Sequence, residues 1–439
     1  MRWSSGSFLR VTTKKGVFDG VVIQRPPLLT KGFVVLKLSS GYNIGILEKS
    51  VVKVEKLKVP SLKSHIPSPT SQVSNPKSRV YDSSLPNVSI LSTGGTISSK
   101  IDYTTGGVYA DYSADDFIEM MPEISKMANI SAKKVCSMMT EDITPKDWLF
   151  VAKKVAEELK KDGVHGVVVT CGTDTMHFIS SALSFLLQGL NKPVIITGSQ
   201  RSIDRGSSDA FLNLACAIKS AAVGPAGVFV CMHETIDDEF CILMHGARVR
   251  KMHTSRRDAF RPMNSGLVAR VSLHSFSLLD SSPWSSFGSA EKFALQSVVN
   301  SNIGLLYAYP GMDSKCVDDM VKRGIKILVV AATALGHVPV HGSSSLVKSF
   351  ERARKKGVLI LITSQTLYGS VHPFVYTNLR VLSVQLGCTF LEGITPETAY
   401  VKAVIVGGRA KKNDDILVLL KKNMIGEFDS REHPEEFLS

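Results

Sequence analysis

The sequence lacks the features that would place it in a membrane or in a disulfide-rich secreted protein. No window reaches the roughly 18 uninterrupted apolar residues that a membrane-spanning helix needs. Residues 1–10 hold no apolar core long enough for a secretory signal. The seven cysteines are irregularly spaced without a Cys-x-x-Cys pair, which argues against a disulfide framework and a structural zinc site. We therefore expect a reduced, cytoplasmic protein with no membrane contact.

Several catalytic motifs are also missing. The chain has no Gly-x-Ser-x-Gly, which argues against a serine nucleophile of the α/β-hydrolase kind. It has no His-Glu-x-x-His either, which argues against a zinc peptidase. We expect neither a metal nor another cofactor in this chain.

The composition is that of a globular protein with a basic excess. The 439 residues suffice for two or three domains, and 44% hydrophobic and 21% charged residues are ordinary values. A net charge of +13 is compatible with a polyanionic partner such as RNA. The lysines and arginines are spread along the chain rather than clustered, so the charge supports such a partner without establishing it.

The N-terminal residues predict a small accessory domain. Short β-branched runs at 17–25, 33–38, 44–47 and 51–54 are separated by turns, a pattern typical of a small β-barrel. We assign this barrel to residues 1–59. Packing against a neighbouring domain and binding of tRNA or a protein partner are equally compatible with the pattern. Residues 60–86 are rich in Ser and Pro and predict a linker.

From Asn87 onward, predicted strands and helices alternate. This alternation is typical of α/β domains with mostly parallel sheets. We predict a larger domain over residues 87–290 and a smaller C-terminal domain over residues 291–439. The alternation is lost over residues 262–302, which we interpret as the passage between the two domains.

Two strand-end loops carry an unusual density of hydroxyl groups and glycines. The predicted strand 88–91 leads into Ser92–Thr96, which holds three hydroxyls and two glycines. The predicted strand 167–170 leads into Gly172–Thr175. Open α/β sheets bind ligands at the carboxyl ends of their strands, and glycines let backbone N–H groups approach a ligand closely. The first loop matches neither a dinucleotide-binding fingerprint nor a phosphate-binding P-loop.

The residues near the second loop suggest activation of a threonine. A threonine hydroxyl is a weak nucleophile at neutral pH and needs a base. Asp174 follows Thr173 directly, and Lys251 lies in a basic run that comes after another strand-like segment. A hydroxyl, a lysine and an aspartate can form a proton relay, in which Asp174 holds Lys251 and Lys251 removes the proton of Thr173. The N–H groups around Gly95 could form an oxyanion hole, typically worth about 3 kcal/mol per donor.

Less specific interpretations of these residues remain open. Asp174 could be a helix N-cap. Lys251 lies among several arginines, as expected of a solvated basic segment. Cys171 has no accompanying His or Asn motif, so we interpret it as a packing residue.

The two loops together resemble a known family. Thr-Gly-Gly-Thr-Ile followed by Cys-Gly-Thr-Asp-Thr-Met resembles the paired signatures of the bacterial-type L-asparaginases, which are amidohydrolases with threonine nucleophiles. The resemblance implies catalytic roles for four residues and substrate contacts for five more. The implied catalytic residues are Thr96, as acyl acceptor, with Thr173, Asp174 and Lys251. The implied substrate-binding residues are Tyr103 on a mobile loop, Thr140, Glu141, Gly95 and Gly172. Which threonine attacks first is left open.

Further features resemble one branch of this family. The N-terminal barrel, the run Lys251–Phe260 and the segments Ala334–Pro339 and Ile394–Lys402 resemble the D subunit of archaeal glutamyl-tRNA(Gln) amidotransferase. The resemblance extends from about Gly16 to Glu427. The chain departs from the family in two places. Cys171 stands where histidine is usual, and Ala332–Ala334 replaces a Gly-Thr-Gly run.

The resemblance implies a division of labour between two kinds of chain. This chain would release ammonia from glutamine or asparagine. A separate amidotransferase chain, the E subunit, with ATP and Mg²⁺, would use the ammonia to convert Glu-tRNA(Gln) to Gln-tRNA(Gln). A homodimer of the asparaginase-like domains within a heterotetramer is implied. The alternatives are a stand-alone L-asparaginase or glutaminase with an accessory barrel, and a non-catalytic RNA-binding or scaffold protein.

Overall fold

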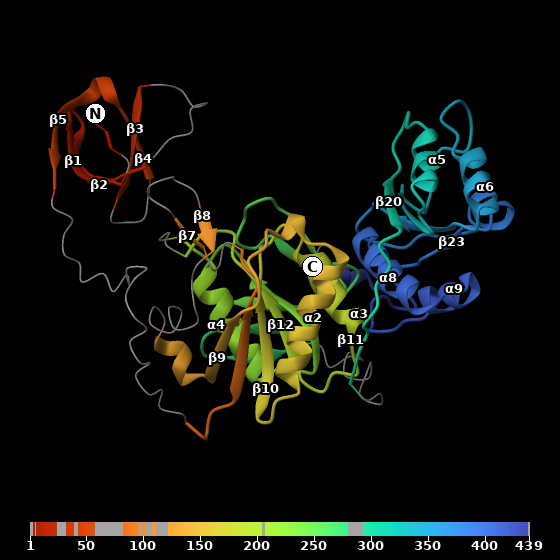
Figure 1. The fold of residues 1–439 in the computed structure, drawn as a ribbon, viewed down its shortest axis with the longest axis horizontal. Helices are drawn as coiled ribbons and strands as arrows, with labels where there is room; N and C mark the ends of the chain where they lie inside the picture. Colours follow the sequence, from red (N-terminus) through yellow and green to blue (C-terminus); the bar gives the residue numbers. More distant parts are fainter. Residues whose placement is uncertain are drawn as a thin grey trace.

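The computed structural model describes residues 3–4, 6–23, 32–38, 43–57, 82–95, 99–101, 108–110, 122–203, 207–279 and 293–437. Most of the predicted linker lies outside these residues. Within them, no helix has the length and apolar character needed to cross a membrane. The described residues form an N-terminal β unit and two α/β units, drawn in red, in orange to green, and in teal to blue (Figure 1).

The N-terminal unit is a five-stranded antiparallel sheet curled around its own core (Figure 1). Its strands follow the order β4-β3-β2-β1-β5, and Val11 and Leu36 are fully buried inside it. The strands are β1 (Phe8–Thr13), β2 (Gly16–Ile23), β3 (Phe33–Leu38), β4 (Asn43–Leu47) and β5 (Val51–Lys56).

Strand β1 is an addition to the sequence-based prediction, in which the first β-branched run began at residue 17. Residues 8–13 pair with β2 on one side and with β5 on the other, so β1 joins the two halves of the sheet. The run is short and follows a polar start, and its β character is evident only from this pairing.

The larger α/β unit contains an eight-stranded mixed sheet, of order β18-β17-β14-β13-β12-β10-β6-β9. The segment from β9 to β13 is parallel, and β13, β14, β17 and β18 continue it in antiparallel fashion. The predicted α/β fold with mostly parallel sheets is thereby confirmed. The strands are β6 (Asn87–Ser92), β9 (Asn129–Lys134), β10 (Val164–Thr170), β12 (Pro193–Thr197), β13 (Gly227–His233), β14 (Cys241–His245), β17 (Ala269–Val271) and β18 (Phe276–Leu278).

The interpretation of residues 262–302 as a simple passage between domains is wrong for its first half. Strands β17 and β18 lie in this region and extend the eight-stranded sheet. Each has only three residues, too few for an alternation pattern to show in the sequence.

Helices cover both faces of this sheet (Figure 1). Val167 and Val169 pack with α2 (Pro145–Leu159) and α3 (Met176–Leu186). Val168, which points to the opposite face, packs with α4 (Ala210–Val223). Helix α2 begins with a capping box between Thr144 and Asp147 and has a proline in its first turn.

The smaller unit repeats this layering around a parallel sheet of order β20-β21-β22-β23. One face packs with α5 and α6, and the other with α8. The elements are β20 (Ile303–Tyr307), α5 (Lys315–Lys322), β21 (Ile327–Ala332), α6 (Val347–Lys355), β22 (Leu359–Ser364), α7 (Thr377–Arg380), β23 (Thr389–Phe390), α8 (Pro396–Arg409) and α9 (Asn413–Lys421).

Helices α3 and α8 join the two α/β units. Their apolar residues belong to a single buried cluster that extends into both sheets. Tyr400 on α8 makes edge contacts with Trp148 and Phe178, each with ring centroids 6.3 Å apart. The smaller unit is thus packed firmly beside the helix that follows the second hydroxyl-rich loop.

Candidate active site

The two hydroxyl-rich loops lie against each other, because β6 and β10 are neighbouring parallel strands. The Thr93 backbone N–H and hydroxyl both donate to the carbonyl of Thr170, at 2.9 and 3.0 Å. Gly95 has φ of +86°, and a Cβ there would lie 2.2 Å from the backbone nitrogen of Gly172. Only glycine can occupy this position without displacing the second loop.

Lys251 reaches the second loop from a separate hairpin. It ends β15 (Val249–Lys251), which pairs with β16 (Phe260–Pro262). Its Nζ donates to Thr173 Oγ1 at 2.9 Å and to Asp174 Oδ1 at 2.7 Å. Thr173 is buried and the side chain of Lys251 is only 10% exposed, whereas Asp174 is 64% exposed. The three side chains that the sequence pattern links are therefore in direct contact.

This geometry can transfer a proton. An amine within hydrogen-bond distance of a hydroxyl can act as its general base when the amine is neutral. The Asp174 carboxylate fixes the amine in place and stabilises the ammonium that forms. The alternative interpretation of Asp174 as a helix cap does not match the structure, because α3 has Thr175 at its N-cap and no side-chain cap bond.

Gln200 is a further residue at this site, and the sequence analysis missed it. The Thr173 hydroxyl donates to Gln200 Oε1 at 3.4 Å. The buried Asp209 carboxylate holds the loop by accepting from the Gln200 backbone N–H at 2.9 Å. Within the described part of the chain, the buried Gln200 Nε2 has no protein partner and can donate to a bound group. Its position just after β12, the next strand of the sheet, was the signal available in the sequence.

Thr140 lies beside the second loop, on a short 3-10 turn, Thr140–Asp142. Its carbonyl accepts from the Thr175 hydroxyl at 2.5 Å, and its hydroxyl accepts from the Thr175 backbone N–H at 3.4 Å. A Cβ on Gly172 would lie 3.1 Å from the Thr140 hydroxyl, so the Thr140 side chain packs closely against the Gly172 backbone. Glu141 is on the same turn and is exposed.

The other two predicted site residues, Thr96 and Tyr103, lie outside the described residues. The first loop is described as far as Gly95, which immediately precedes Thr96. The assigned roles of Thr96 and Tyr103 therefore stay predictions.

Two titratable groups beside the loop are held in their neutral forms. Burial raises the pKa of the Cys171 thiol to about 12, which agrees with its interpretation as a packing residue. The pKa of His177, in the first turn of α3, falls to about 3 because its imidazole is shielded from water. The positive charges of Arg250 and Lys251 lower that pKa further.

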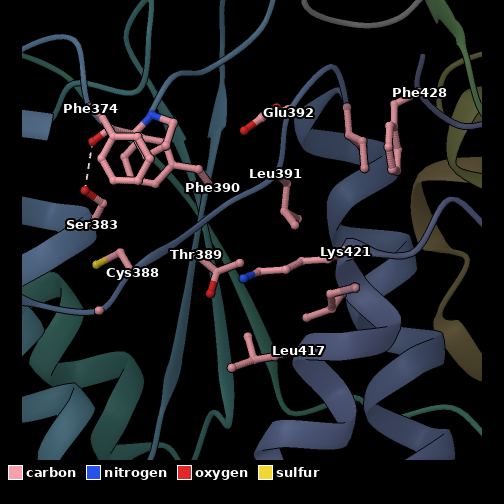
Figure 2. Close-up of a pocket in the computed structure, with 14 residues that line it drawn as sticks. Phe374, Ser383, Cys388, Thr389, Phe390, Leu391, Glu392, Leu417, Lys421 and Phe428 are labelled. Atoms are coloured by element: carbon pink, nitrogen blue, oxygen red, sulfur yellow. Dashed lines mark hydrogen bonds between the residues drawn. The ribbon is translucent and has the colours of Figure 1, made fainter. Parts of the chain in front are cut away.

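A pocket of about 600 Å³ lies elsewhere, in the smaller unit between β23 and α9 (Figure 2). Phe374, Phe390 and Phe428 contribute to its walls. None of the predicted site residues lines it. The candidate chemistry therefore belongs to the loops around Thr173, and this pocket is separate from it.

Family models match most of the chain. The model described as "Asparaginase, N-terminal" matches residues 87–283, and "Glutaminase/Asparaginase C-terminal domain" matches residues 302–419. The model described as "GatD N-terminal domain" matches residues 3–57.

Individual proteins and solved structures agree with these matches. The D subunit of glutamyl-tRNA(Gln) amidotransferase from Pyrococcus abyssi is 37% identical over 96% of this chain and 94% of that protein. The Methanopyrus kandleri D subunit is 38% identical over 97% of this chain and 92% of that protein. The thermostable L-asparaginase from Thermococcus kodakarensis superposes with a TM-score of 0.70 at 26% identity, covering 79% of this chain and 100% of that one.

These matches confirm the predicted family and bring all three units of the chain under one assignment. The sequence resemblance rested on the paired loops and the N-terminal unit, and both are now matched independently. The chain belongs to the D-subunit family of the glutamyl-tRNA(Gln) amidotransferases, whose two α/β units have the asparaginase fold.

Proposed function

We propose that this chain is the ammonia-releasing amidase of a tRNA-dependent amidotransferase, with Thr173, Asp174 and Lys251 at its reaction centre. The observation that carries the proposal is the bridge from Lys251 Nζ to both Thr173 Oγ1 and Asp174 Oδ1, at 2.9 and 2.7 Å. Membership of the D-subunit family supplies the substrate class.

The bridge suggests how the amide bond is cleaved. Neutral Lys251 takes the proton of the Thr173 hydroxyl, and the Thr173 oxygen attacks the side-chain amide carbon of glutamine or asparagine. If Thr96 attacks instead, Thr173 accepts the Thr96 proton as it gives its own proton to Lys251. The C–N bond then breaks, and the Lys251 ammonium returns its proton to the leaving NH₂ group, which departs as ammonia. Water hydrolyses the acyl-threonine ester and regenerates the hydroxyl.

The developing negative charge on the amide oxygen needs hydrogen-bond donors. Gly95 and Gly172 lie where the two loops meet, and backbone N–H groups are common donors to such a charge. We assign the oxyanion site to this junction. We assign a supporting role to Gln200 Nε2, which has no hydrogen-bond partner among the described residues.

The two candidate nucleophiles are Thr96 and Thr173. The experiment that separates them locates the acyl group. Acid quenching during turnover, followed by peptide mass spectrometry, would find the added mass on the peptide that holds Thr96 if that residue is the acyl acceptor. Added mass on the Thr173 peptide instead would make Thr173 the nucleophile.

The rest of the reaction is assigned to partners. The E subunit of the amidotransferase would bind ATP and Mg²⁺ and activate the glutamate of Glu-tRNA(Gln), and ammonia from this chain would complete the amide. We propose a homodimer of this chain within a heterotetramer, acting in the cytoplasm. This chain itself would need no cofactor.

The test measures glutamine and asparagine hydrolysis by this chain, alone and with the E subunit, ATP and Glu-tRNA(Gln). The proposal predicts ammonia release that rises when the partner and the tRNA are present, together with formation of Gln-tRNA(Gln). Full hydrolysis by the chain alone, unaffected by either, would instead identify a stand-alone asparaginase or glutaminase.

A further inference from the structure

The residue next to Lys251 is held by the smaller α/β unit. Arg250 pairs with Glu397, with Nη2 3.1 Å from Oε1 and Nη1 3.4 Å from Oε2. The Tyr307 hydroxyl donates to Glu397 Oε1 at 3.1 Å. Glu397 lies in the first turn of α8, where the helix dipole favours a carboxylate, and its side chain is 7% exposed. A two-pronged, largely buried ion pair therefore reaches from the smaller unit to the strand that carries Lys251.

The turn before that strand is held in the same way. The Thr398 hydroxyl, one residue after Glu397, donates to the carbonyl of Ala247 at 2.8 Å. The buried Arg248 pairs with Asp429 at 2.5 Å, from the C-terminal segment that follows α9. The end of the chain returns to the larger unit in Figure 1, consistent with this contact. In each of these contacts, one residue belongs to the larger unit, in or just before β15. Its partner comes from the C-terminal third of the chain.

We propose that the Glu397–Arg250 ion pair is a positioning device by which the smaller unit fixes Lys251 and balances the charge beside it. Glu397 and Arg250 are positioning residues, and neither is placed in contact with the substrate. The inference rests on the proposed function, because it concerns the base that the amidase mechanism requires.

The position of Lys251 matters because its amine must reach Thr173 and Asp174 together. β15 has only three residues, and Lys251 is the last of them. One further backbone hydrogen bond, from Met252 N–H to the Ala259 carbonyl, follows. So short a hairpin does not by itself fix a side chain at its end. A displacement of about 1 Å between reacting groups can lower the rate about a hundredfold. Holding Arg250 in place therefore helps to keep the Lys251 amine at its working distance.

The charge of the pair matters because several ionisable groups surround it. Asp174 faces Lys251 from the second loop, and His177 faces both cations from α3. Arg261 lies opposite Arg250 on β16 and is paired with Asp258. Since each of these charges is already partnered or neutral, removing the Glu397 charge leaves Arg250 as the uncompensated cation next to Lys251.

Two matched neutral substitutions follow from this arrangement. E397Q leaves the Arg250 cation unbalanced, which disfavours a positive charge on the Lys251 amine. R250Q leaves the Glu397 carboxylate unbalanced, which favours that charge. A purely structural defect would not move the pH dependence of activity in opposite directions in the two variants.

The experiment records the pH dependence of kcat/KM for glutamine hydrolysis by the full chain in its complex with the partner protein. The acid limb of this profile, over which kcat/KM rises with pH, should move by about one pH unit. It should move to lower pH in E397Q and to higher pH in R250Q. In the double variant R250Q/E397Q it should return to the wild-type position. R250K keeps the charge but loses the two-pronged contact, so kcat should fall about tenfold with the acid limb unmoved.

Controls separate this inference from the proposed function. D318N breaks a comparable pair with Arg352, 2.6 Å long and remote in sequence from Lys251, and should leave the profile unchanged. An active K251M variant would overturn the proposed function itself. If K251M is inactive, shifts of the same sign in E397Q and R250Q, or none, would overturn the positioning role. An unchanged kcat in R250K would also overturn the positioning role, even if E397Q and R250Q fail to fold.

Discussion

At the scale of single residues, Cys171 adjoins the reactive loop and yet takes no part in the proposed chemistry. It is fully buried, and burial raises its pKa to about 12, so the nucleophilic thiolate is absent at neutral pH.

We expect C171A to retain glutamine hydrolysis within about twofold of wild type, while losing about 1 kcal/mol of stability through the small cavity. Steady-state ammonia release and thermal unfolding measure the two effects. A hundredfold loss of activity in a folded C171A protein would make the thiol a participant.

Two buried histidines make the stability of the folded protein depend on pH. The pKa values of His177 and His245 both fall to about 3, chiefly because burial disfavours the charged imidazole. On unfolding they return to about 6.5 and bind protons. The unfolded state therefore gains protons between pH 6.5 and 3, and stability falls as the pH drops through this window.

We expect the thermal midpoint to be level above about pH 7 and to fall steadily below about pH 6. H177N removes one of these groups and should make that fall shallower. An unchanged slope in H177N would show that His177 does not contribute to acid sensitivity.

The strand-end loop drew attention to Thr173 and Asp174, and the family resemblance assigned the role of Lys251 within its basic run. Gln200 and Glu397 were missed for a physical reason. Gln200 lies 27 residues from Thr173 in sequence, and Glu397 lies 147 residues from Arg250. Only its position after a strand marks Gln200, and nothing local marks Glu397. Their roles depend on which strands and helices become neighbours.

At the scale of elements, the junction of the two loops depends on Gly95. Its φ of +86° and the 2.2 Å distance from an added methyl carbon to Gly172 make any side chain there intrusive. The neighbouring backbone atoms cannot move aside as a flexible side chain could.

We therefore expect G95A to lower glutamine hydrolysis more than a hundredfold, because the second loop is pushed out of register with Lys251. G311A is the matched control, since Gly311 has a similar φ of +79° but nothing within 4 Å of the added carbon. The ammonia assay compares the rates of glutamine hydrolysis by G95A and G311A. Equal activities would show that only backbone strain, and no contact between the loops, limits position 95.

The elements that sequence patterns missed were the shortest or the least regular. Strands β17 and β18 have three residues each, and β1 begins eight residues from the N-terminus after a polar start. Strand β10 was predicted over residues 167–170 because its continuous apolar run is visible in the sequence.

At the scale of the whole molecule, the N-terminal unit has a core of its own. Its buried cluster contains residues between Leu9 and Ile46, and the other buried clusters of the described residues begin at Val88. The folding of the two α/β units should therefore not depend on it.

We expect a chain that begins at Asp82 to keep the thermal midpoint of the α/β units and to hydrolyse glutamine within about threefold of the full chain. Calorimetry and the ammonia assay compare the two chains. Binding of the E subunit and of tRNA to each would then show whether the N-terminal unit contacts either partner. Loss of hydrolysis in a folded shortened chain would contradict the independence of the site.

The central claim is that Lys251 activates Thr173 while Asp174 holds it. The most direct measurement is ammonia release from glutamine by K251M and T173V, with folding checked by circular dichroism and with D318N as a surface-charge control. The account predicts at least a thousandfold loss in each folded variant, comparable with the loss of a general base or a nucleophile, and wild-type rates in D318N. Ammonia release at the wild-type rate by either K251M or T173V would contradict it.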